Sequence, residues 1–569
     1  MFLPTTRQEM HSLGWDSLDV ILITGDSYID SPYVGVAVIG KLLVKEGFRV
    51  GIIAQPGYKD LTDIGRLGEP DLFWGVTAGC VDSMVSNYTA LKKKRRTDDY
   101  TPGGINDRRP DRASIVYSNL IRRFSNNLHP KIQSKPILLG GIEASLRRIA
   151  HYDFWSDQIR RSILFDAKAD YLLYGMAEKS ILDFSRCLKD GIDPVNVRGL
   201  CYIAKEIPPD IINLPSFEDV SQDKKAFTQM FHVFYQNNDP LNAKGLAQKH
   251  SDRFLIQNPP AIYTSQTELD DIYLLDYEYN QHPFYEKIGP VRALETIRFS
   301  ISTHRGCYGE CNFCAIAVHE GRTIRWRSPE SIIKEAERLT KIDGFKGYIH
   351  DLGGPTANMY GYECRKKLKS GSCQNKRCVT PDVCPLLIID HSQITELLKQ
   401  IRRIKGVKKI FVSSGIRYDL LFSDNAHCDD YMHELIDHHV SGQLKVAPEH
   451  SQEYVLEKMG KPGNQDLLKF KVKFDQFSKS AGKNQFLTYY MIAAHPGCTE
   501  NDMLKLKEFS SNKLKINPEQ VQIFTPTPST YSTLMYYTEI DPFTNEPMFV
   551  EKNPENKQRQ KQIVIHKNE

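Results

Sequence analysis

Residues 298–314 read RFSISTHRGCYGECNFC, an apolar run of the kind that forms a strand, followed at once by three cysteines. Cys307, Cys311 and Cys314 are spaced C-x3-C-x2-C in a loop that also carries glycine, glutamate and asparagine. Soft thiolate ligands suit iron–sulfur clusters, and three of them leave one iron of a four-iron cluster open. The spacing therefore predicts a [4Fe-4S] cluster that can bind one further ligand.

Three other interpretations of these cysteines are weighed against it. A structural zinc site would need a fourth ligand, which His304 or His319 could supply. A ferredoxin-type electron carrier would supply four cysteines, and buried core cysteines would not sit in so polar a loop.

Six apolar runs follow one another from this stretch to about residue 525, with amphipathic helical stretches between them. Alternation of this kind predicts a parallel sheet, and six strands are too few for a closed eight-stranded barrel. We expect an open (βα)6 partial barrel. The strands are expected at 298–303, 346–352, 408–414, 443–447, 485–493 and 520–524, with helices beginning near Ser328, Ser392, Asp429, Asn464 and Glu500.

Glycine and polar residues gather where these strands end, the face at which parallel βα barrels build their sites. The second strand ends in Gly353, Gly354 and Thr356, and glycines let a backbone approach a ligand closely. Arg417 follows the third strand and Glu449 the fourth, where a charged side chain needs a partner. These five residues are the candidate ligand contacts.

The N-terminal region also alternates strands and helices. Apolar runs at 19–24, 49–54, 71–77, 136–141 and 170–174 predict a Rossmann-like, doubly wound sheet. We expect this α/β domain over 1–195, a connecting subdomain over 196–294, and the barrel over 295–545 with a cysteine-rich insertion at 360–390. A polar, mobile tail is expected over 546–569.

The motif CYGECNFC resembles the cluster loop of the radical S-adenosylmethionine (radical SAM) enzymes. The resemblance implies that SAM chelates the open iron and is reductively cleaved to a 5′-deoxyadenosyl radical. It also implies that Gly353, Gly354 and Thr356 lie against the methionine part of SAM, although Pro355 replaces the usual acidic residue. A reductant such as flavodoxin or ferredoxin is implied as a partner.

Further segments, in the same order along nearly the whole chain, resemble the YgiQ-type radical SAM proteins. They are GDSYIDSPYVG (25–35), YTPGG (100–104), LLGGIEASLRRIAHYDFW (138–155), DLGGPTANMYG (351–361), LKVAPEH (444–450) and FTPTPSTYSTLMYYT (524–538). That resemblance implies no particular substrate. A non-catalytic iron–sulfur or zinc scaffold or electron carrier, and a radical SAM enzyme that modifies RNA, remain as alternatives.

A second cysteine set, Cys364, Cys373, Cys378 and Cys384, lies in the insertion at C-x8-C-x4-C-x5-C. The spacing fits neither a zinc ribbon nor a ferredoxin, so a zinc ion, an auxiliary iron–sulfur cluster or free thiols remain open.

The N-terminal domain resembles the cobalamin-binding domains that precede some radical SAM cores. Those domains carry the cobalt ligand in an Asp-x-His-x-x-Gly loop, and this chain reads DSPYVG at 30–35. The missing histidine argues against cobalamin, and we expect the fold without the corrin.

Composition limits the partners. The 569 residues are 40% hydrophobic and 25% charged, which excludes a disordered or coiled-coil chain. The net charge of +4 indicates neither a nucleic-acid nor a membrane partner, and no apolar run is long enough to span a bilayer. We expect a cytoplasmic protein. The basic run Lys92–Arg96 is expected to be a solvated loop, with an RNA backbone contact as the weaker alternative.

Overall fold

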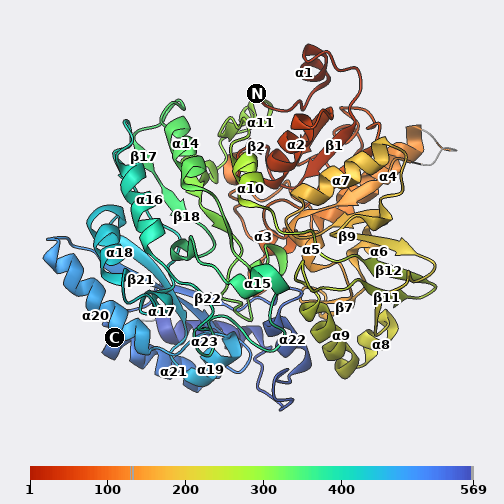
Figure 1. The fold of residues 1–569 in the computed structure, drawn as a ribbon. Helices are drawn as coiled ribbons and strands as arrows, with labels where there is room; N and C mark the ends of the chain where they lie inside the picture. The colour runs from red at the N-terminus through yellow and green to blue at the C-terminus, as the bar shows by residue number, and fades with distance from the viewer. Residues whose placement is uncertain (129, 131–133, 566–569) are drawn as a thin grey trace. The chain divides into compact units, whose positions relative to one another are not determined.

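The computed structural model describes residues 1–128, 130 and 134–565 (Figure 1). The chain divides into two compact units. One comprises Met1–Thr264 and Asp271–Arg298, and the other comprises Ser265–Asp270 and Phe299–Glu569. Both are α/β units, so the predicted fold class is confirmed.

A nine-stranded sheet forms the centre of the N-terminal unit. Its parallel part confirms the five predicted strands, which pair in an order typical of doubly wound sheets. Strands β1 and β3 are buried along their whole length because residues on both faces are covered. In spatial order the strands are β3 (Val50–Ala54), β1 (Val20–Thr24), β4 (Phe73–Thr77), β5 (Ile137–Leu139) and β8 (Tyr171–Leu173).

The expected connecting subdomain over 196–294 is not a separate packing unit. Four strands from this region, β9 (Leu200–Ala204), β12 (Arg253–Gln257), β11 (Leu246–His250) and β10 (Ile212–Leu214), continue the same sheet beyond β8. The pairs β8–β9, β9–β12 and β11–β12 are antiparallel, so they need no crossover helix. Polar residues within these short strands hid the pattern.

Six strand positions in the C-terminal unit run parallel, and neighbours along the chain are neighbours in the sheet. Pairings join β14 to β18, β17 to β19, Ile416 to Val446, β20 to β21 and β21 to β22. This is the succession expected of the partial barrel. The strands are β14 (Ser300–Ser302), β17 (Tyr348–Ile349) with β18 (Asp351–Gly353), β19 (Lys409–Ile410), β20 (Gln443–Glu449), β21 (Phe486–Ala493) and β22 (Gln520–Ile523).

Helices between these strands begin close to the predicted starts. Helix α14 (Pro329–Leu339) shows why: the Ser328 side chain accepts a hydrogen bond from the Ser331 backbone N–H, and Pro329 occupies the first turn. The corresponding helices are α16 (Ser392–Arg402), α18 (Cys428–Glu434), α20 (Gln465–Ser480) and α21 (Glu500–Phe509).

Shorter elements complete the two units. In the N-terminal unit they are α1 (Arg7–Ser12), β2 (Ile29–Asp30), α2 (Gly35–Lys45), α3 (Ser83–Asn87), η1 (Pro102–Gly104), α4 (Ala113–Leu128), α5 (Gly141–Leu146), β6 (His151–Asp153), β7 (Gln158–Arg160), α6 (Ile163–Ala167), α7 (Glu178–Lys189), η2 (Pro194–Asn196), α8 (Phe217–Gln222), α9 (Lys224–Gln236), β13 (Asn280–Gln281), α11 (Pro283–Glu286) and α12 (Leu294–Ile297). Helix α10 (Gln266–Tyr273) belongs to both units. The C-terminal unit adds β15 (His304–Arg305), α13 (Ile316–His319), β16 (Arg325–Trp326), η3 (Ala357–Met359), α15 (Arg365–Ser370), α17 (Tyr418–Leu421), η4 (Leu435–His439), α19 (Glu453–Met459), η5 (Ser510–Leu514), α22 (Tyr531–Thr538) and α23 (Pro554–Ile565).

The expectation of a mobile tail over 546–569 is wrong for the part that the structure describes. Residues Pro554–Ile565 form α23, and residues 566–569 lie outside the described residues. Gln560 is fully buried and its side-chain oxygen accepts a hydrogen bond from the Ala494 backbone N–H at 2.9 Å. Lys557 donates to the Tyr536 hydroxyl at 2.8 Å. Polar side chains hold this helix because each finds a buried partner.

None of the helices in the described residues combines the length and the apolar composition needed to cross a bilayer.

Candidate active site

The cysteine loop, residues 306–314, follows the first barrel strand. Strand β15 precedes the loop and β16 follows it, and the two strands pair antiparallel, which brings the chain before and after the loop together. Gly306 has φ +79°, and a Cβ there would lie 2.6 Å from the Thr323 carbonyl oxygen. Glycine is therefore required at the entry to the loop.

Two of the sulfur atoms lie close to Gly309. A Cβ at that glycine would lie 3.2 Å from the Cys307 Sγ, 3.7 Å from the Cys311 Sγ and 3.0 Å from the Arg417 Nη1. Cys314 interacts electrostatically with both other thiols. The loop thus holds three thiols around one region that also contains a guanidinium group.

Burial raises the pKa of Cys307, and the neighbouring Cys311 adds to the effect, while Arg417 lowers it. Burial likewise raises the pKa of Cys314. Thiols in this state are protonated at neutral pH, so binding of a metal cluster releases protons. The nearby positive charge of Arg417 reduces the cost of forming the thiolates.

Segments that follow each of the other five strand positions reach the cysteine loop. Thr356 Oγ1 and Met359 Sδ each lie 3.8 Å from the Cys307 Sγ, and Arg417 Nη1 lies 3.8 Å from the Cys311 Sγ. The remaining contacts come from the segments after β20, β21 and β22: Asn312 N to the Met459 carbonyl at 2.8 Å, the Phe313 ring 6.4 Å from that of His495, and Ser532 N to the Asn312 carbonyl at 2.9 Å. The loop therefore lies at the carboxyl edge of all six strands.

Backbone conformations at this edge are unusual. Glu310, Glu449, Ala494 and Ser529 all have positive φ angles, between 47° and 69°, although none is glycine. Such residues cost free energy and gather at functional sites when the surrounding structure enforces them. Glu449 ends β20, Ala494 directly follows β21, and Ser529 lies in the segment after β22, where ligands bind in parallel α/β folds.

Gly353 and Gly354 end strand β18, but protein atoms already fill the space beside them. A Cβ at Gly353 would lie 2.8 Å from the Ser414 hydroxyl, and one at Gly354 would lie 2.6 Å from the His304 ring. Both positions therefore need glycine for internal packing. Thr356, in contrast, presents its hydroxyl to Cys307.

Arg417 and Asp419 form a buried pair that the sequence did not predict. Arg417 Nε donates to Asp419 Oδ1 at 2.8 Å, and Nη2 donates to Oδ2 at 2.5 Å. Burial alone lowers the pKa of Arg417, but Asp419 and the thiols of Cys311 and Cys307 raise it above its ordinary value. Asn358 fixes the Arg417 backbone by accepting from its N–H at 2.8 Å and donating to its carbonyl at 3.1 Å. The Arg-x-Asp spacing was the available signal.

Glu449 lies at the end of β20 with its carboxyl group buried. Burial raises the pKa of Glu449, and the nearby Lys461 and Arg417 offset the effect only in part. A raised pKa extends the pH range over which this carboxyl group is protonated, and the protonated form can donate a hydrogen bond to a ligand.

Replacing Glu449 with glutamine is expected to raise the thermal stability of the protein at pH 8. A raised folded pKa means that stability is fully present below the ordinary value of 4.5 and is lost as the pH rises through the folded pKa. Glutamine keeps the neutral form at every pH, so the gain should vanish toward pH 4. Circular dichroism melts across this range measure it. A lower midpoint for Glu449→Gln at pH 8 would contradict the assignment.

The insertion over 360–390 contacts the cysteine loop through two basic side chains. The sequence did not indicate these contacts. Lys367 Nζ lies 3.2 Å from Glu310 Oε1 and is buried. Arg377 donates to the Glu310 carbonyl at 3.1 Å and to the Asn312 side-chain oxygen at 2.6 Å. The basic residues of the insertion therefore hold the backbone and the acidic side chain of the loop in place.

The second cysteine set is partly brought together. Cys364, Cys378 and Cys384 pack in one apolar cluster, which also contacts Cys307, whereas Cys373 is half-buried outside it. Burial raises the pKa of Cys378 to about 11. Neutral thiols in an apolar cluster fit the free-thiol interpretation, and a metal at this set stays a prediction.

Neither cysteine set is arranged for a single zinc ion. Within the residues that the structure describes, neither gathers three ligand atoms within 4.8 Å of one another. Tetrahedral zinc with bonds of about 2.3 Å requires sulfur atoms about 3.8 Å apart. A four-iron cluster has no such requirement, because each thiolate binds a different iron.

The histidines near the site have structural partners. His450 accepts from the Gln452 backbone N–H at 3.1 Å, and its other ring nitrogen lies 3.5 Å from the Cys498 sulfur. The His304 ring packs on Gly354, and burial lowers its pKa to about 4. Among the described residues, neither His304 nor His319 offers a ring nitrogen that lies with two of the loop sulfur atoms within 4.8 Å of one another.

Sequence comparison assigns the family. Residues 2–300 match the family described as Radical SAM N-terminal, and residues 301–510 match the Radical SAM superfamily. A UPF0313 protein of Fusobacterium nucleatum is 56% identical over 566 residues, covering 100% of this chain and 99% of that protein. The chain belongs to the UPF0313 family of radical SAM proteins. A UPF0313 protein of Thermotoga neapolitana is 48% identical over 570 residues, with 100% and 99% covered.

The family assignment confirms the resemblance to YgiQ-type proteins and makes the chain a radical SAM enzyme. Two solved structures of radical SAM enzymes also align with it. The methyltransferase TsrM from Kitasatospora setae, with cobalamin and a [4Fe-4S] cluster bound, is 14% identical with TM-score 0.49, covering 91% of this chain and 74% of TsrM. OxsB with aqua-cobalamin bound is 12% identical with TM-score 0.49, covering 92% and 56%.

The prediction against cobalamin is wrong as an exclusion. It rested on one missing histidine in residues 30–35, whereas solved structures that align with 91% and 92% of this chain contain cobalamin. At these identities and TM-scores, the alignments assign no cofactor to this chain.

The basic run Lys92–Arg96 is exposed. Lys92 lies 4.8 Å from the centre of the Phe154 ring, and Arg95 Nε donates to the Tyr88 carbonyl at 3.1 Å. Two of the five charges are thus held by contacts within the unit. The RNA contact stays a prediction.

Proposed function

We propose that this radical SAM enzyme holds a [4Fe-4S] cluster on Cys307, Cys311 and Cys314 and binds SAM at the carboxyl edge of the barrel strands. The supporting observation is that segments after all five other strand positions contact the cysteine loop. Parallel α/β folds bind ligands at this edge. The substrate is not part of the proposal.

The residues present fit the cluster. Three thiols lie on one loop, and a buried guanidinium group faces two of them. When bound, the cluster supplies the electron that cleaves SAM reductively.

The chain's own groups then have defined tasks. Arg417, held by Asp419, places positive charge beside the sulfur atoms of Cys307 and Cys311. Thr356 presents a hydroxyl at the edge of the same loop, and Glu449 offers a buried carboxyl group that accepts a hydrogen bond or, when protonated, donates one. The Gly353 carbonyl accepts from the Thr303 backbone N–H at 2.7 Å, which holds the end of β18 beside the strand that leads into the cysteine loop.

Anaerobic protein, reconstituted with iron and sulfide and reduced by dithionite or flavodoxin, is expected to convert SAM into 5′-deoxyadenosine and methionine. Chromatography of the products measures the conversion. A fully assembled cluster that yields no 5′-deoxyadenosine above a protein-free control would overturn the proposed reaction and favour the electron carrier.

A further inference from the structure

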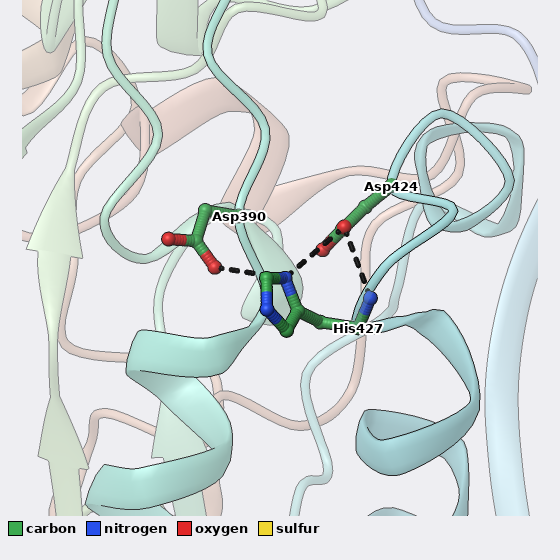
Figure 2. A group of neighbouring side chains, drawn as sticks. All are labelled: Asp390, Asp424 and His427. Atoms are coloured by element: carbon green, nitrogen blue, oxygen red, sulfur yellow. Dashed lines mark hydrogen bonds and ion pairs between the residues drawn. The ribbon is translucent and has the colours of Figure 1, made fainter.

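A second group of metal-binding side chains lies apart from the cysteine loop. Asp390, Asp424 and His427 each offer one ligand atom, and the three atoms lie within 4.8 Å of one another (Figure 2). Asp390 precedes α16, while Asp424 and His427 precede α18. Among the described residues, no other three or more histidines, cysteines, aspartates and glutamates meet this distance.

These three side chains are gathered without being well hydrogen-bonded to one another. His427 Nδ1 lies 3.4 Å from Asp390 Oδ1 and 3.3 Å from Asp424 Oδ1, longer than the roughly 2.7–2.9 Å of a charge-assisted hydrogen bond. That nitrogen atom is buried and has no hydrogen-bond partner in the part of the chain that the structure describes. Figure 2 shows the ring between the two carboxylates.

His391 orients the Asp424 carboxylate through hydrogen bonds to the oxygen that does not face His427. Asp424 Oδ2 accepts from the His391 backbone N–H at 2.8 Å and from the ring Nδ1 at 2.9 Å. The other ring nitrogen of His391 accepts from the Tyr362 hydroxyl at 2.7 Å. With Oδ2 used in this way, Oδ1 of the buried Asp424 is directed to His427, where it accepts from the backbone N–H at 3.2 Å and lies 3.3 Å from the ring Nδ1. Outer hydrogen bonds of this kind orient the ligands of metal sites.

We propose that Asp390, Asp424 and His427 bind one divalent transition cation. Two carboxylates and one imidazole suit Mn²⁺, Fe²⁺ or Zn²⁺, and the two negative charges balance the ion. Three protein ligands leave coordination positions for water.

A bound ion would link the start of α16 to the start of α18 and stabilise the residues that connect this site to the cysteine loop. His391, which holds Asp424, also lies 3.3 Å from the side-chain nitrogen of Asn358. Asn358 in turn holds the backbone of Arg417, the residue beside Cys311. A bound ion would therefore fix both ends of the segment 417–427.

Mn²⁺ is the probe. Full-length protein with an oxidised, diamagnetic cluster is titrated with Mn²⁺, and electron paramagnetic resonance measures the free ion. We expect about one Mn²⁺ bound per chain, displaced by Zn²⁺, and an affinity at least about 10-fold weaker in Asp390→Asn and in His427→Gln. His433→Gln, an exposed histidine on the same helix α18, is the matched control and should bind normally.

Equal Mn²⁺ binding by the wild type and the Asp390→Asn/His427→Gln variant would overturn the proposal, as would no binding at all. Iron and sulfide content, measured in parallel, reports the cluster independently of this site. Anomalous diffraction from wild-type crystals grown with Mn²⁺ gives a test that requires no variant to fold. A peak between the three side chains supports the site, and Mn²⁺ peaks found only elsewhere reject it.

Discussion

Replacing Cys307, Cys311 and Cys314 together with alanine is expected to abolish cluster assembly and all cleavage of SAM. The structure directs these thiols to one region, and in the part of the chain that the structure describes no histidine nitrogen lies with two of these sulfur atoms within 4.8 Å of one another. Anaerobic reconstitution should show a loss of about four irons per chain together with the optical and electron paramagnetic resonance signals of the cluster. Circular dichroism checks that the fold is retained.

Two comparisons make this result specific. Cys187→Ala removes a partly exposed thiol from the N-terminal unit and should leave the iron content unchanged. Replacing the second cysteine set, Cys364, Cys373, Cys378 and Cys384, should leave the about four irons of the loop in place if those thiols only pack. A triple loop variant that keeps its full cluster signal would show that the loop does not bind the cluster.

The strands of both units could be predicted because buried parallel strands are short, continuous apolar runs. The five strands predicted for the N-terminal sheet, and five of the six predicted for the C-terminal unit, lie within about two residues of the expected ranges, whereas β19 ends at Ile410, four residues short of the expected end. The carboxyl ends of these strands also predicted where the candidate ligand-contacting residues would lie, because parallel strands end at one edge of the sheet. The cysteine loop at that edge therefore followed from local pattern alone.

Long-range partners could not be predicted in the same way. Lys367 and Arg377 bind cysteine-loop residues that lie 57 or more positions away in the sequence. Nothing in the local sequence distinguishes either basic residue from its neighbours. The extension of the N-terminal sheet by β9–β12 was missed for a related reason. Its antiparallel strands contain polar residues, such as Gln248 and Lys249, that mask an apolar run.

The two glycines after β18 show a subtler limit. Sequence pattern marked Gly353 and Gly354 as places where a ligand approaches, and the structure shows that a Cβ at either would meet Ser414 or His304. Internal packing is sufficient to require glycine at both positions. Their contact with SAM therefore depends on their backbone atoms and stays a prediction.

Arg417→Leu is expected to lower the free energy of unfolding of the C-terminal unit by about 3–5 kcal/mol. The substitution leaves the Asp419 carboxylate buried without its bidentate partner, and an unpaired buried charge is among the costliest defects in a protein. Urea unfolding measures the loss, monitored by circular dichroism. A loss below about 0.5 kcal/mol, the usual range for surface substitutions, would contradict the buried pairing.

The Arg417→Leu/Asp419→Leu double variant separates stability from the effect on the cluster. Removing both charges abolishes the unpaired carboxylate, so most of the lost stability should return. The double variant removes one positive and one negative charge, but Arg417 Nη1 faces the sulfur atoms whereas Nε and Nη2 face Asp419, so the lost positive charge is the nearer one. A reduced cluster carries more negative charge than an oxidised one. The reduction potential of the cluster should therefore fall in the double variant even though its fold is restored. An unchanged potential would mean that Arg417 serves the fold alone, because a residue with a purely structural role has no reason to alter the energy of adding an electron to the cluster.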